Sequence, residues 1–133
     1  MNEMSVAIER LQFAIRTLPA ILAGFTEAES EQRPTPERWT KKEVVGHLID
    51  SAFNNHQRFV HGQIAGPHDF PAYDQEQWVR VQHYQTAPWN DLIPLWQAAN
   101  THLVHIASEV GWRRVCPLIR VLRPQLDGHF TSP

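Results

Sequence analysis

The sequence predicts an all-α protein, and three observations carry this prediction. Apolar residues recur at steps of three and four along three long stretches, which is the period of an amphipathic helix. Helix-capping residues stand where the second and third of these stretches begin. After Val110 the apolar period stops, and Pro117 and Pro124 interrupt the remaining chain. We therefore predict a helical domain over residues 1–110 and an irregular tail over residues 111–133.

The first helix is expected over residues 3–23. Its apolar positions form one seam, namely Met4, Ile8, Leu11, Ile15, Leu18 and Leu22. Pro19 removes a backbone hydrogen bond from a helix interior, so we expect a kink or an end near residues 17–18 and a short turn through Phe25. Residues 27–39 are polar and contain two prolines, which predicts an ordered connection.

The central helix, expected over residues 40–64, is the most informative stretch. Thr40 and Glu43 form a capping box at its start, and the preceding Trp39 is either a hydrophobic staple or a pocket wall. One side of this helix is apolar, and the other carries a polar stripe: His47, Asp50, Ser51, Asn54, Arg58 and His61. Two interpretations of the stripe stay open. It is a solvated face, or it lines a polar cleft in which His47 binds a metal.

A loop over residues 66–73 should follow the central helix. Asp74 and Gln77 make a second capping box, which predicts a short helix through about Gln85. Trp78 and Val81 are three residues apart and are expected to pack inward together.

The last long helix is expected to begin at Pro88 or Asn90 and to end at Val110. His102 and His105 lie three residues apart on one face, so they could chelate a single metal ion. The alternative is one partly buried, hydrogen-bonded histidine and one exposed histidine.

Composition excludes several classes of protein. The net charge is −2 and the pI is near 6.4, so neither a nucleic-acid partner nor a membrane-surface partner is expected. The chain carries one cysteine, Cys116, and acidic residues near its N-terminus, which is typical of a cytoplasmic protein. Its six glycines form no phosphate-binding loop, so a nucleotide cofactor is not expected.

The central helix resembles a known family in the pattern W-T-x-x-E-V-x-G-H-L-x-D, which runs from Trp39 to Asp50. This pattern is similar to the second-helix signature of the DinB-like (YfiT-type) superfamily. The resemblance implies an up-down bundle of the four-helix type and a divalent metal held by three histidines. It also implies thiol-transferase or hydrolase chemistry. The first histidine of that set corresponds to His47, but the family's last helix with its H-x-x-x-H pair has no counterpart after Val110.

The resemblance assigns His47 as a ligand of zinc or nickel. We expect the other two nitrogens from His102 and His105, with His61 or another chain as the alternative sources, and a small-molecule substrate held by Asp50, Asn54 and Arg58. The alternative function is a non-catalytic helical binding or dimerisation protein that has lost the metal. Because no regular fourth helix covers the polar stripe, we expect water, the tail or a second chain to cover it, and we predict a homodimer.

Overall fold

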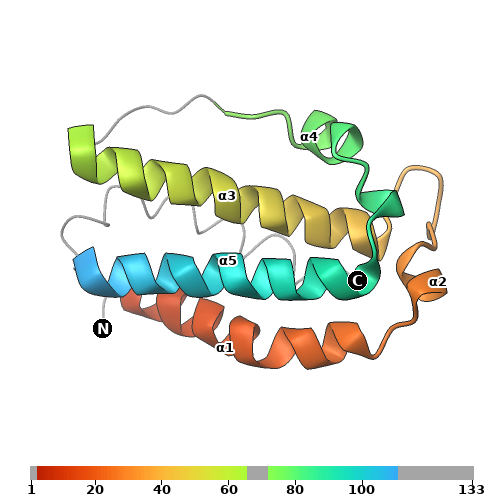
Figure 1. Ribbon diagram of the computed structural model, residues 1–133, viewed down its shortest axis with the longest axis horizontal. Helices are drawn as coiled ribbons and strands as arrows, with labels where there is room; N and C mark the ends of the chain where they lie inside the picture. The colour runs from red at the N-terminus through yellow and green to blue at the C-terminus, as the bar shows by residue number, and fades with distance from the viewer. Residues whose placement is uncertain (1–2, 66–71, 111–133) are drawn as a thin grey trace.

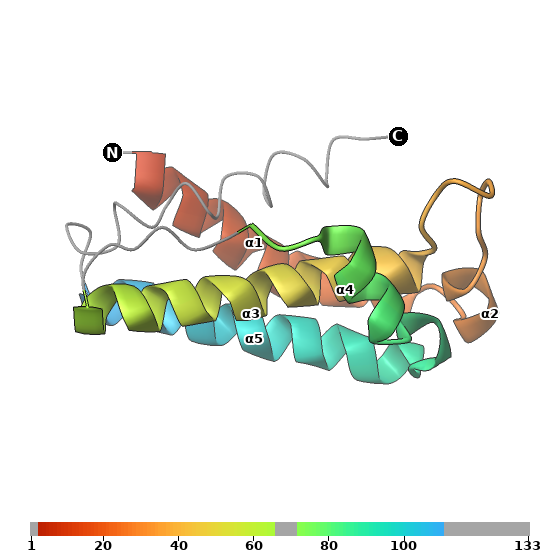
Figure 2. The same ribbon diagram turned by 90° about the horizontal axis from the view of Figure 1, so that it is seen from above.

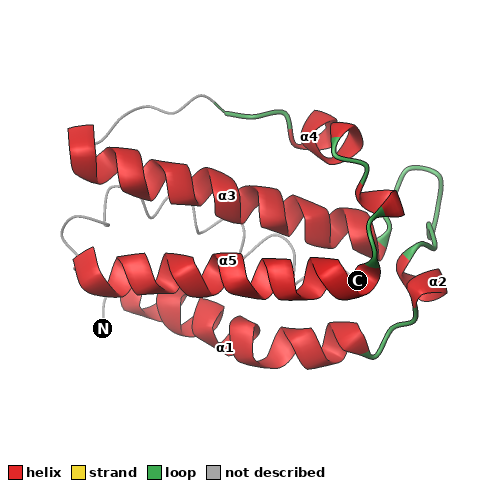
Figure 3. Ribbon diagram, in the orientation of Figure 1, coloured by secondary structure: helices red, strands yellow, loops and turns green. Residues whose placement is uncertain are grey.

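The computed structural model describes residues 3–65 and 72–110, and within these ranges the chain consists of helices and connecting turns (Figure 3). The long helices are α1 (Glu3–Ala23), α3 (Lys41–Ala65) and α5 (Trp89–Val110). The short ones are α2 (Glu27–Ser30), α4 (Gln75–Val81) and the 3₁₀ helix η1 (Tyr84–Thr86). The all-α prediction is confirmed. The predicted irregular tail over residues 111–133 lies outside the described residues.

Helix α5 lies between α1 and α3 and packs against both (Figure 1). One apolar cluster joins the late residues Phe59 of α3 and Leu103 of α5, and the other joins the early residues Val45 and Trp89. Helices α3 and α5 therefore run in the same direction, and α1 runs opposite to both. The predicted up-down bundle did not specify that two of its long helices, α3 and α5, run parallel. None of the helices in the described ranges is long and apolar enough to cross a bilayer.

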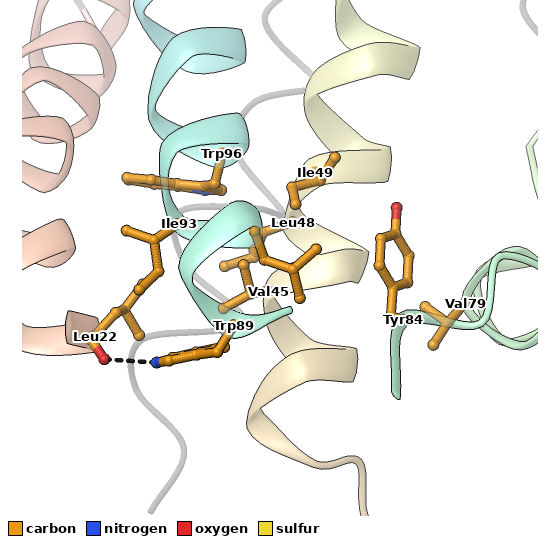
Figure 4. Packing of buried hydrophobic residues seen from close by; sticks show 10 residues of the cluster. Leu22, Val45, Leu48, Ile49, Val79, Tyr84, Trp89, Ile93 and Trp96 are labelled. Atoms are coloured by element: carbon orange, nitrogen blue, oxygen red, sulfur yellow. Dashed lines mark hydrogen bonds between the residues drawn. The ribbon is translucent and has the colours of Figure 1, made fainter. Parts of the chain in front are cut away.

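The core is richest where the starts of α3 and α5 meet the end of α1 (Figure 4). Trp89 is almost fully buried, and its indole Nε1 donates a 2.9 Å hydrogen bond to the Leu22 carbonyl oxygen. A buried indole N–H needs such a partner, because leaving it unpaired would cost its full desolvation energy. This bond fixes the end of α1 against the start of α5.

Pro19 does not end the first helix, so of the two outcomes expected near residues 17–18, a kink or an end, the end is wrong. Helix α1 continues through it to Ala23. Proline has no N–H to donate to the carbonyl four residues earlier, which is that of Ile15. The Gln97 side chain of α5 donates to this carbonyl instead, at 3.3 Å. A tertiary contact therefore replaces the lost helical hydrogen bond. The residues around Pro19 could not reveal this contact, because Gln97 lies far away in the sequence.

The predicted capping box of the central helix is present. The Glu43 amide donates to Thr40 Oγ1 at 3.2 Å, and the Thr40 amide donates to Glu43 Oε1 at 3.0 Å. The prediction of a polar connection without a helix over residues 27–39 was only partly right. Its first four residues form α2, which begins with its own capping box between Thr26 and Glu29.

Residues 72–88, the described part of the segment between α3 and α5, form the returning segment, in which α4 and η1 pack against α3; Figure 2 shows α4 in front of α3. Asp74 caps α4 by accepting the Gln77 amide, which is one half of the predicted capping box. The helix was expected to run through about Gln85, but α4 ends at Val81 and the 3₁₀ helix η1 follows. The expected inward pair was wrong, because Trp78 and Val81 are both exposed. Val79 is the buried residue of α4, and it packs in the cluster that contains the Tyr84 ring.

Candidate functional site

A buried polar layer runs along α3 from its second to its fourth turn. His47 and Asp50 are buried, as are Ser51 and Asn55. The stripe that we predicted for α3 is thus not a solvated face at this end of the bundle. Residues from the returning segment and from the connection before α3 contact it directly.

Asp50 is the anchor of the layer. Its Oδ1 accepts a 2.5 Å hydrogen bond from the Tyr84 hydroxyl and a 2.7 Å hydrogen bond from Gln82 Nε2. Burial raises the pKa of the Asp50 carboxyl, and the two donated hydrogen bonds oppose that rise. Burial is also the largest cause that raises the pKa of the Tyr84 phenol far above its usual range, and the hydrogen bond to the Asp50 carboxylate is the next largest. Tyr84 therefore stays a neutral donor, which ties η1 to α3.

Tyr84 can approach this closely because α3 has a glycine beneath it. A Cβ atom at Gly46 would overlap the Tyr84 ring. The glycine of the G-H-L-x-D pattern thus serves packing, since it lets an aromatic ring lie directly on the helix backbone.

The other predicted substrate-binding residues lie one to two turns further along α3. Asn54 is half-buried, and its side-chain amide donates to the Asp50 backbone carbonyl at 2.8 Å. Ser51 Oγ lies 3.0 Å from the Tyr73 hydroxyl. Burial raises the pKa of Tyr73, whereas the positive charge of Arg58 lowers it. Asp50, Asn54 and Arg58 thus lie along one line of α3, and Asp50 is occupied in holding the returning segment.

A hollow of about 610 Å³ opens beside this layer. It lies between the connection that precedes α3 and the α4–η1 segment, and its walls include Trp39 and Tyr84. Trp39 also contacts the His47 ring, at a centroid distance of 5.2 Å. Trp39 is therefore a pocket wall, which was one of the two roles predicted for it. The hollow and the buried layer share these two aromatic rings.

The predicted metal ligands are not brought together. His102 lies against His56, with ring centroids 5.4 Å apart. His56 is nine residues beyond His47, which places it roughly 13 Å further along α3 at 1.5 Å per residue. Both His102 and His105 are exposed, whereas His47 is buried. One metal ion cannot bind His47 together with His102 and His105 in this arrangement.

The described residues therefore do not fit a catalytic zinc or nickel site. Such a site requires three protein ligands about 2 Å from one ion. Within residues 3–65 and 72–110, no three His, Cys, Asp or Glu side chains are grouped so that they could hold a metal. A site that includes His47 would need further ligands from elsewhere.

Some residues that organise this region were not predicted. Lys42 is buried, and its ammonium donates to Glu27 at 2.6 Å and to Glu31 at 2.9 Å. The sequence did contain a signal for this ion pair. Glu27 and Glu31 are four residues apart, which places both acids on one side of a helix, where one lysine can reach them. Tyr84 and Gln82 had no such signal, since their contact with Asp50 spans more than 30 residues.

Comparison with known proteins gives one result. The family model of the DinB superfamily matches residues 10–121, which is most of the chain. The chain matches no curated protein and no solved structure. The matched range includes the G-H-L-x-D pattern, all of α3 and α5 and most of α1, and with this match we conclude that the chain belongs to the DinB superfamily.

Proposed function

We propose that this member of the DinB superfamily is a small-molecule-binding protein that does not use His47, His102 and His105 as one catalytic metal centre. The hollow of about 610 Å³ carries the proposal. Its volume is within the range of small-ligand sites, and its lining is mostly polar and charged, with Trp39 and Tyr84 as its aromatic walls. The separation of His47 from the two histidines of α5 supports the non-catalytic half of the proposal.

The walls of the hollow are pre-organised, which favours binding. Tyr84 is fixed by Asp50, and Gln85 accepts a 2.7 Å hydrogen bond from Thr40 Oγ1. Arg33 is paired with Glu43 at 2.8 Å. A ligand would meet side chains that are already ordered, so little conformational entropy would be lost on binding.

Metal analysis of the untagged protein tests the non-catalytic half of this proposal. We expect the zinc and nickel content per chain to be the same in the wild type and in His47→Ala, because no metal ion depends on His47. About one equivalent that disappears in His47→Ala would overturn the proposal, because it would show that His47 is a ligand.

A second candidate is a divalent-metal-dependent enzyme of the thiol-transferase or hydrolase type that acts on a small-molecule substrate. The buried His47, at the position of the family's first ligand, favours it. Its remaining ligands would have to come from outside the described residues or from a second chain. The metal analysis separates the two candidates, and the metal would be zinc or nickel.

We further propose a homodimer in the cytoplasm. Phe13 and Ile21 of α1 and Ile64 of α3 are exposed apolar side chains that a second chain could bury. Light scattering at micromolar concentration tests this proposal, and a monomer mass would refute it.

A further inference from the structure

A second group of histidines lies on the surface between α3 and α5, away from the hollow. His56 of α3 is half-buried, whereas His102 and His105 of α5 are exposed. The His56 and His102 ring centroids are 5.4 Å apart, and those of His102 and His105 are 6.1 Å apart. The sequence indicated the α5 pair, but only the parallel packing of the two helices brings His56 to it.

The spacing of the first pair matches that of two imidazoles on one metal ion. With metal–nitrogen bonds near 2.1 Å and a tetrahedral angle, the ring centroids would lie about 5 Å apart. The rings are tilted by 43°, and binding would require rotation about the side-chain bonds to turn one nitrogen of each ring toward a common point. His102 is exposed and can make this rotation among its staggered rotamers, whereas the half-buried His56 is the more fixed of the two ligands.

We propose that His56 and His102 form an inter-helix site for a divalent transition metal such as zinc, nickel or copper. Water completes the coordination, and His105 supplies a third nitrogen after its side chain rotates. No three ligands are pre-arranged in the described part of the chain, so the two-histidine bridge is the basis of the site. It is separate from His47 and does not depend on the function proposed above.

The site has a structural consequence because its two ligands come from different helices. A metal bound there would connect the second half of α3 to the second half of α5. Since it would bind the folded chain and not the unfolded one, it would raise the melting temperature with increasing metal concentration. Proton competition for the imidazole nitrogens would weaken binding in acid.

Calorimetric titration of the full chain with Ni²⁺ or Zn²⁺ at pH 7.5 tests the proposal. We expect one site per chain, weakened at least about tenfold in His56→Ala and in His102→Ala, and less in His105→Ala. His83→Ala is the matched control, because His83 is also exposed but lies beside η1 at the far end of the bundle. Circular dichroism without metal should show that the variants are folded.

Three results would overturn the proposal. One is an absence of binding to the wild-type chain, and another is binding that His56→Ala and His102→Ala leave unchanged. The third is a loss in His83→Ala as large as that in the His56 variant. Binding that is lost only in His47→Ala would instead identify the family's metal site, so the two hypotheses fail separately.

Discussion

Replacing Tyr84 by phenylalanine removes one oxygen atom from the buried layer. That hydroxyl donates to Asp50 Oδ1 at 2.5 Å, and both residues are buried, so water cannot easily take its place. A hydrogen bond to a charged group contributes about 1.5–3 kcal/mol. Asp50 keeps its bond from Gln82, which limits the loss. We expect Tyr84→Phe to lower the free energy of unfolding by about 2 kcal/mol, or the melting temperature by roughly 6–10 °C.

The pH dependence of this loss tests its cause. The Tyr84 hydroxyl lowers the pKa of Asp50, so its bond is stronger to the carboxylate than to the neutral acid. The loss should therefore shrink as the pH falls through the raised pKa of Asp50. Urea unfolding between pH 4 and pH 8 measures it, with Tyr73→Phe as a control whose bond goes to the uncharged Ser51. A loss below about 0.5 kcal/mol, or one equal to that of the control at every pH, would refute the reasoning.

Three further predictions concern stability. Asp50→Asn should flatten the pH dependence of the free energy of unfolding. Because burial raises the pKa of Asp50, the folded chain binds the proton more tightly than the unfolded chain does. The wild type therefore loses stability as the pH rises from about 3.9 to that raised pKa, and the asparagine variant does not. An unchanged slope in urea titrations would contradict this. Gly46→Ala should destabilise by about 1–3 kcal/mol because the new methyl group overlaps the Tyr84 ring, and a stabilised variant would show that the ring can move away. Leu103→Ala should cost about 2–5 kcal/mol, since Leu103 is fully buried; chemical denaturation measures it, and a cost under 1 kcal/mol would place Leu103 outside the core.

The long helices could be predicted because their signals are local. The capping box at Thr40 and the apolar period behind it depend only on residues within a few positions of each other. Helix α2 was missed because four residues are too few to show a period, although Thr26 and Glu29 carried the capping signal. In α4 the three-residue spacing of Trp78 and Val81 was misleading, since Val79 is the buried residue.

The candidate site was predictable only in part. His47 and Asp50 were identified from the family pattern, and both are buried in one layer. Their neighbour Trp39 belongs to the same pattern and was predicted as a possible pocket wall, whereas Tyr84 and Gln82 come from a segment that no periodicity connects to α3. The location of His102 depended on the direction of α5 relative to α3, which the order of elements along the sequence does not determine.

The parallel pairing of α3 and α5 also affects how the chain folds. Two consecutive antiparallel helices can dock as soon as a short turn forms, but α3 and α5 are separated by 23 residues. Closing a connection of that length costs about 1.5 kcal/mol more entropy than closing a four-residue turn. Docking of α5 also joins Trp89 to Leu22, 67 positions earlier. Assembly of this bundle thus depends on distant contacts, and we expect it to fold more slowly than a hairpin bundle of equal length.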